Sequence, residues 1–158
     1  MKRLHLHIAV SDLAASRAFY TALLGTEPVV AKPDYLKWET QEPALNLAVS
    51  ARGTRAAGLN HLGIQAMEDE ALAELNGRIN AARIETLDEP DAHCCYATGR
   101  KRWASDPDGV VWEVFRTMDT ARTYGRDRGK AETATRPGRD QSEAAGTGEA
   151  RRPAGACC

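Results

Sequence analysis

The sequence predicts an α+β domain built from two successive βαβββ modules. Segments with period-2 alternation are separated by two stretches of helical periodicity, and the same order of elements occurs twice. A short motif repeats with that order: His5-Leu6-His7-Ile8 matches His61-Leu62-Gly63-Ile64 at three of four positions. The agreement between motif and element order indicates an internal duplication.

Length and charge favour a single domain without a nucleic-acid or membrane partner. The 158 residues fit one domain, because domains commonly contain about 100–150 residues. The 21 basic and 22 acidic residues leave no excess of either sign, whereas nucleic acids and anionic membranes select basic surfaces. No apolar run approaches the roughly 20 residues of a membrane helix, and the first residues do not resemble a signal peptide. We therefore expect a cytoplasmic protein.

Residues 4–10 begin the first module as a strand in which apolar and other residues alternate. Its large aliphatic side chains point to one face, and His5 and His7 point to the other. The Ser-Asp pair at 11–12 can cap the helix that follows, and Gly25 is suited to end it. The apolar residues of this helix form one stripe: Leu13, Phe19, Tyr20, Leu23 and Leu24. Short strands are expected at about 28–31, 35–40 and 44–49.

Residues 59–66 begin the second module as another strand, and residues 68–82 follow with the spacing of an amphipathic helix. The motif Asp106-Pro107-Asp108-Gly109 predicts a tight turn, because proline presets the backbone at its second position. Strands are expected near 83–87, 93–97, 100–105 and 110–116.

The composition changes near residue 118. Residues 1–118 carry the hydrophobic periodicity, with modules at about 3–50 and 58–116. Residues 119–158 contain one aromatic residue, 8 of the 21 basic residues and 6 of the 22 acidic ones. Such a segment buries too little apolar surface to offset the entropy lost on ordering. We therefore expect one folded domain at 1–118 and a mostly disordered tail that ends in Cys157-Cys158.

Three side chains on the predicted strands suggest a metal site. His5 and His61 lie opposite the apolar faces of their strands, and Glu113 lies among large apolar residues of the last strand. A buried, ionised glutamate needs a cationic partner, which is either a metal ion or an arginine. Two imidazoles and one carboxylate form a facial triad that leaves coordination positions open and suits non-haem Fe(II). The same donors also suit Mn, Ni or Zn.

His7 is an alternative ligand to His5, because it lies on the same face about 7 Å along the strand. The internal repeat aligns His61 with His5 and Gly63 with His7. We therefore expect His5 to be the ligand and His7 to be a pocket residue.

These segments resemble the vicinal oxygen chelate superfamily, which includes glyoxalase I, extradiol dioxygenases and fosfomycin resistance proteins. The opening run resembles the start of its domain: His5-(x)4-Val10-Ser11-Asp12-Leu13-(x)2-Ser16-(x)2-Phe19-Tyr20-(x)3-Leu24-Gly25. The run Asp106-Pro107-Asp108-Gly109-(x)3-Glu113 resembles its closing strand pair. The resemblance spans about residues 3–116. It implies paired βαβββ modules that form a cupped sheet around a metal site, and it leaves the reaction open.

A vicinal cysteine pair narrows this resemblance. The run Cys94-Cys95-Tyr96-Ala97-(x)3-Lys101-(x)-Trp103 resembles the Fe(II)-dependent C–As lyases, also known as arsenic-inducible or cadmium-induced proteins. These enzymes cleave trivalent organoarsenicals such as methylarsenite with dioxygen. The resemblance implies that Cys94 and Cys95 bind the arsenical beside Fe(II). Further residues expected near the pocket are His7, His93, Tyr96 and Lys101.

The chemistry of the pair is consistent with this substrate. A monosubstituted As(III) has two exchangeable positions, which two soft thiolates can fill. Adjacent residues of a regular strand point to opposite faces, so we expect Cys94 and Cys95 at a strand start or in an irregular loop. Buried thiols can also be small hydrophobic residues. Two other functions therefore stay open, a non-catalytic soft-metal (Cd or As) binding protein and a glyoxalase or extradiol dioxygenase. Either a monomer or a homodimer can form the cup.

Overall fold

Two βαβββ modules follow one another along the chain, as the sequence predicts. The computed structural model describes residues 1–52, 56–94 and 96–121. The first module contains β1 (Lys2–Ala9), α1 (Leu13–Leu24), β2 (Val30–Lys32), β3 (Tyr35–Gln41) and β4 (Ala44–Ser50). The second module contains β5 (Gly58–Ala66), α2 (Asp69–Ala81), β6 (Leu87–Cys94), β7 (Ala97–Ser105) and β8 (Val111–Thr120).

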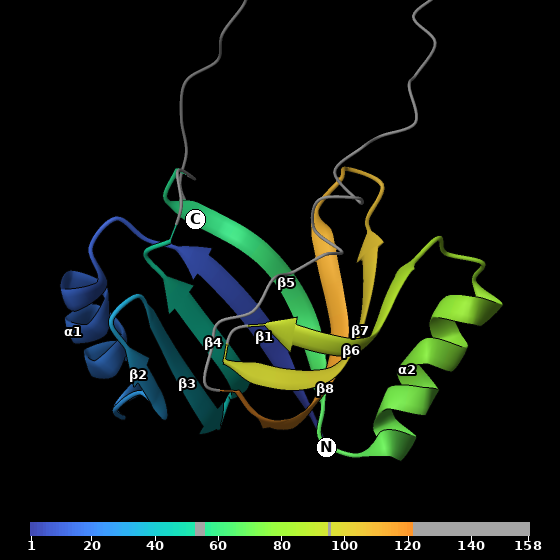
Figure 1. Cartoon of the computed structure of the whole chain (residues 1–158), viewed down its shortest axis with the longest axis horizontal. Helices are drawn as coiled ribbons and strands as arrows, with labels where there is room; N and C mark the ends of the chain where they lie inside the picture. Colours follow the sequence, from blue (N-terminus) through green and yellow to red (C-terminus); the bar gives the residue numbers. More distant parts are fainter. Residues whose placement is uncertain (53–55, 95, 122–158) are drawn as a thin grey trace, which may run out of the picture.

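All eight strands belong to one mixed sheet with the order β2-β3-β4-β1-β5-β8-β7-β6. The first strands of the two modules, β1 and β5, are antiparallel neighbours at its centre. Each also pairs in parallel with the last strand of its own module, β1 with β4 and β5 with β8. Figure 1 shows that the sheet is strongly curved and that α1 and α2 lie outside it at opposite ends. The cupped sheet predicted from the sequence is therefore confirmed.

Each helix covers the outer face of its own module. The first core cluster is built around Trp38 and Val49, both fully buried, and includes Leu13, Tyr20 and Leu24 of α1. The second is formed by the following residues of α2, β5 and β8: Leu72, Leu75, Ala66 and Val114. Because side chains alternate along a strand, filling the outer face with aliphatic residues leaves the histidines on the concave face.

Helix α1 begins and ends at the residues that the sequence predicts. The side chain of Asp12 accepts a hydrogen bond from the backbone N–H of Ala15 at 2.9 Å, so Asp12 is the N-cap. Gly25 ends the helix with φ +66°, a conformation that glycine adopts without steric cost. Neither helix is long and apolar enough to cross a membrane, within the part of the chain that the structure describes.

The strand boundaries predicted after α2 are wrong in two places. Residues 83–86 are not a strand, because the chain still wraps around the helix end: Ile84 N–H bonds to the Ile79 carbonyl at 3.2 Å, and Arg83 has φ +54°. The segment 93–97 is not one strand, because it contains the turn between β6 and β7. The apolar composition of residues 93–97 is typical of a strand, and it did not indicate the turn between Cys94 and Ala97. At the other end, β8 continues to Thr120, two residues beyond the expected limit of the periodic segment.

Gly63 lies where β5 and β8 approach each other closely. It pairs with His5 on one side and with Glu113 on the other. A Cβ atom at Gly63 would lie 2.4 Å from the backbone carbonyl oxygen of Glu113, which is closer than real Cβ contacts. The strands must therefore move apart to accept any side chain, and such a shift would displace two residues of the concave face.

We expect Gly63→Ala to lower the free energy of unfolding by about 1–3 kcal/mol, because the added methyl group overpacks the space between two strands. Gly77→Ala is the matched control. Gly77 lies in α2 with no heavy atom within 4 Å of an added Cβ, so alanine should stabilise the helix by about 0.5–1 kcal/mol. Urea unfolding followed by circular dichroism measures both. Equal stabilities for the two variants would contradict the close approach.

Candidate metal centre

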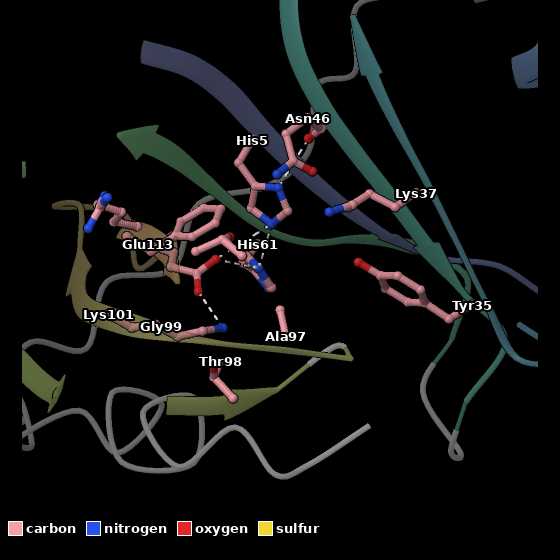
Figure 2. Close-up of a pocket in the computed structure, with 13 residues that line it drawn as sticks. His5, Tyr35, Lys37, Asn46, His61, Ala97, Thr98, Gly99, Lys101 and Glu113 are labelled. Carbon is pink, nitrogen blue, oxygen red and sulfur yellow. Dashed lines mark hydrogen bonds and ion pairs between the residues drawn. The ribbon is translucent and has the colours of Figure 1, made fainter. Parts of the chain in front are cut away.

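Three side chains from the central strands converge on the concave face of the sheet. His5 comes from β1, His61 from β5 and Glu113 from β8. The two Nε2 atoms are 3.2 Å apart, and Glu113 Oε2 lies 3.5 Å from His5 Nε2 and 3.3 Å from His61 Nε2. Figure 2 shows the three side chains pointing toward one another. The structure thus brings together the three ligands proposed from the sequence.

Hydrogen bonds orient both imidazole rings toward this point. His5 Nδ1 lies 3.1 Å from the backbone carbonyl oxygen of Asn46, and His61 Nδ1 lies 3.0 Å from Asn60 Oδ1. Both partners are acceptors, so each ring carries its proton on Nδ1 and presents the lone pair of Nε2. The Asn46 side chain in turn donates to Gln65 Oε1 at 3.0 Å. Such outer hydrogen bonds are typical of metal-binding histidines.

Burial controls the protonation of this site. His5, His61 and Glu113 are 6%, 2% and 1% exposed. Burial is the main reason that the pKa of His5 falls to about 4, which keeps this imidazole neutral at pH 7. Burial would raise the pKa of Glu113, but the positive charge of Lys101 and the contacts with His61 hold it well below its usual range. The site therefore contains neutral imidazole and an ionised carboxylate.

This donor set fits a divalent metal ion. The ligand atoms of the three residues all lie within 4.8 Å of one another. Two nitrogen lone pairs and one carboxylate oxygen face each other in a buried space, and a cation between them would remove their mutual repulsion. Two histidines and one carboxylate occupy one side of a metal and leave other positions open. A small pocket of about 40 Å³ beside the triad has room for water-sized ligands.

The pocket combines residues of both modules. From the first module come Tyr35, Lys37 and Asn46, and from the second come the residues of β7 and β8: Ala97, Thr98, Gly99, Lys101, Phe115, Arg116 and Thr117. Lys101, predicted to lie near the pocket, does so, and its ammonium group is 2.6 Å from Glu113 Oε1. Asn46 and Asn60, which accept hydrogen bonds from the histidine Nδ1 atoms, were not among the residues predicted from the sequence. Asn46 alternates with leucines in β4 on the same face as the histidines, and this pattern could have identified it.

His7 and His93, the other two histidines, differ in position. His7 is buried beside the triad, with its ring centre 5.0 Å from that of His61. Its Nε2 faces Ser50 Oγ at 2.9 Å and not the three ligand atoms. This arrangement favours His5 over His7 as the ligand. His93 lies on β6 and is exposed.

Cys94 lies at the end of β6, two residues before Tyr96 and three before the start of β7. Cys94 is the last residue of β6 and pairs with Ala97, a residue that lines the pocket. The Cys94 side chain and the whole of Cys95 lie outside the described residues, as do Cys157 and Cys158. Tyr96, directly before β7, has φ +61°, a left-handed conformation that is common in turns.

Tyr96 anchors this turn to the first module. Its hydroxyl donates to Asp34 Oδ1 at 2.8 Å, and Asp34 also pairs with Arg52. The Tyr96 ring lies 5.8 Å from that of Tyr35, whose own ring approaches His7. Figure 1 shows the β6–β7 hairpin extending back across the cup toward the first module. Tyr96 is thus held against the first module, next to Ala97 of the pocket.

Comparison with known proteins agrees with this architecture. Residues 2–114 match the model of the Glyoxalase/Bleomycin resistance protein/Dioxygenase superfamily. Among solved structures, a homoprotocatechuate 2,3-dioxygenase from Arthrobacter globiformis has a TM-score of 0.53 at 18% identity, covering 82% of this chain and 38% of that one. A Mn(II)-bound glyoxalase from Novosphingobium aromaticivorans has a TM-score of 0.52 at 22% identity, covering 80% and 43%. These two likenesses concern the fold alone.

Curated relatives are more similar in sequence. A trivalent organoarsenical cleaving enzyme from Thermomonospora curvata is 34% identical over 127 residues, which are 80% of this chain and 84% of the relative. A second enzyme of that name, from a Bacillus species, is 38% identical over 122 residues, or 76% of each chain. The cadmium-induced protein CadI of Mycobacterium tuberculosis is 32% identical over 125 residues, which are 79% of this chain and 82% of CadI. The chain belongs to the Glyoxalase/Bleomycin resistance protein/Dioxygenase superfamily.

Proposed function

We propose that this chain is an Fe(II)- and O2-dependent C–As lyase that converts trivalent organoarsenicals such as methylarsenite to inorganic arsenite. The observation that supports the proposal is that Cys94 pairs with Ala97, which lines the same pocket as His5, His61 and Glu113. Relatives at 34% and 38% identity are named trivalent organoarsenical cleaving enzymes, which supports the same substrate class.

The triad would hold the iron through His5 Nε2, His61 Nε2 and a Glu113 oxygen. A bound Fe(II) with open positions supplies the one-electron chemistry that dioxygen needs to react with a closed-shell substrate. The protein's contribution would be to aim the imidazoles through their Nδ1 hydrogen bonds to Asn46 and Asn60, and to keep His5 neutral by burial.

The cysteine thiolates would bind the arsenical. An As(III) centre with one carbon substituent exchanges its two remaining ligands for Cys94 and Cys95, and the carbon stays attached. The hydrogen bond from Tyr96 to Asp34 ties the residue that follows the cysteine pair to the first module. Holding the reacting groups together removes much of the entropic barrier of a reaction between three partners.

The decisive experiment is turnover with the full-length protein. Protein loaded anaerobically with Fe(II) receives excess methylarsenite and then air, and arsenite is measured by chromatography coupled to arsenic detection. We expect many equivalents of arsenite per protein in air and none without oxygen or after chelation of iron. Binding of arsenical without turnover would instead support a soft-metal binding protein. Activity with only a catechol or a methylglyoxal–glutathione hemithioacetal would support the third function.

Cys94→Ala and Cys95→Ala should each lower arsenite production at least a hundredfold, because one thiolate cannot fill both exchangeable positions of As(III). Iron content should not change, since neither cysteine belongs to the triad. The matched control replaces Cys157 and Cys158 with alanine. It removes two thiols, one more than either single variant, beyond the residues that match the superfamily and should keep turnover. Full activity in both single variants of the turn would exclude the thiolate clamp.

A further inference from the structure

The two carboxylate oxygens of Glu113 face different partners. Oε2 points toward the Nε2 atoms of His5 and His61, at 3.5 and 3.3 Å. Oε1 points away from them and forms an ion pair with the ammonium group of Lys101 at 2.6 Å. Figure 2 shows this division, with the Lys101 side chain reaching Glu113 from β7. Oε2 would therefore be available to a metal bound by the triad, whereas Oε1 is already paired with Lys101.

The fold holds Lys101 in this position. In the pairing of β7 with β8, Lys101 lies opposite Phe115 and Trp103 lies opposite Glu113. Lys101 thus approaches Glu113 as a diagonal cross-strand neighbour, a separation that a long side chain can span. Its ammonium group lies 5.4 Å from the centre of the Trp103 ring and 5.8 Å from that of Phe115. These aromatic faces attract the cation, and the lysine side chain is only 11% exposed.

We propose that Lys101 is a positioning residue that restricts Glu113 to metal binding through Oε2 alone. A carboxylate can bind a metal through one oxygen or through both. With Oε1 held by Lys101, Glu113 occupies one coordination position, and the metal keeps one more position for water or another ligand. This inference rests on the part of the proposed function that assigns a metal to the triad. It does not depend on the arsenical substrate.

The same contact has an electrostatic consequence. The triad carries one negative charge, and Lys101 neutralises it across a short distance in a buried site. A divalent cation that binds there is repelled by the ammonium group, and this repulsion is weakly screened because solvent is excluded. Lys101 should therefore weaken metal binding while it preserves an open position. A residue with a purely structural role would not produce both effects.

Mn(II) is a suitable probe, because its coordinated waters can be counted by water-proton relaxation and by line broadening in 17O-enriched water. In Lys101→Met, which removes the charge and keeps an unbranched side chain, Glu113 should bind Mn(II) through both oxygens. We expect one coordinated water fewer than in the unmodified protein and a dissociation constant for Mn(II) about tenfold lower. Thermal unfolding of each variant checks that the fold is kept, and Lys101→Leu serves if the Met variant does not fold.

Two controls separate the contact with Glu113 from a general loss of positive charge. Lys2→Met makes the same substitution outside the pocket, at a lysine whose ion pair is with Glu74. It should keep both the water count and the affinity for Mn(II). Lys101→Arg retains a cation opposite Oε1 and should keep the water count.

An unchanged water count and unchanged affinity in Lys101→Met would overturn the inference. So would weaker Mn(II) binding in that variant, which would indicate a structural role only. If the unmodified protein failed to bind Mn(II), Fe(II) or Co(II), the metal assignment within the proposed function would fail instead.

Discussion

The structure depends on how an ionised glutamate is accommodated inside the cup. Glu113 is buried beside two imidazole nitrogens that present lone pairs, and such a group of acceptors is unfavourable without positive charge. Lys101 supplies that charge on one side, and the donor set is suited to a cation on the other. The three side chains are almost fully buried, and the pairing of β1, β5 and β8 brings them together. Both Lys101 and a cation at the triad would therefore serve to balance the buried negative charge of Glu113.

Duplication of the βαβββ module explains how the three side chains come together. Each module contributes its first strand to the centre of the sheet, so His5 and His61 become neighbours across the β1–β5 pair. Glu113 comes from the last strand of the second module, next to β5. The glycine at position 63 permits the close approach of these strands. In the first module the corresponding strand, β4, contributes Asn46, which orients His5 and does not belong to the triad.

The fold does not determine the reaction. Dioxygenases and a glyoxalase share it at 18% and 22% identity, and fold similarity of this kind supports many activities. The cysteine pair at 94–95 is the sequence feature on which the proposed substrate class depends. Tyr96, two residues after Cys94, contacts Asp34 and Tyr35 of the first module.

The sequence by itself determined the two modules, the outward direction of the aliphatic side chains and the choice of His5, His61 and Glu113, because these follow from periodicity and from an internal repeat. It did not determine the β6–β7 boundaries, since the apolar segment 93–97 has the composition of a strand although it contains a turn. Only the tertiary structure revealed the Lys101 ion pair, the hydrogen bonds that orient the imidazoles and the contact between Tyr96 and Asp34. Most of these contacts join residues far apart in the chain, and their geometry depends on sheet register and curvature, which local sequence patterns do not specify.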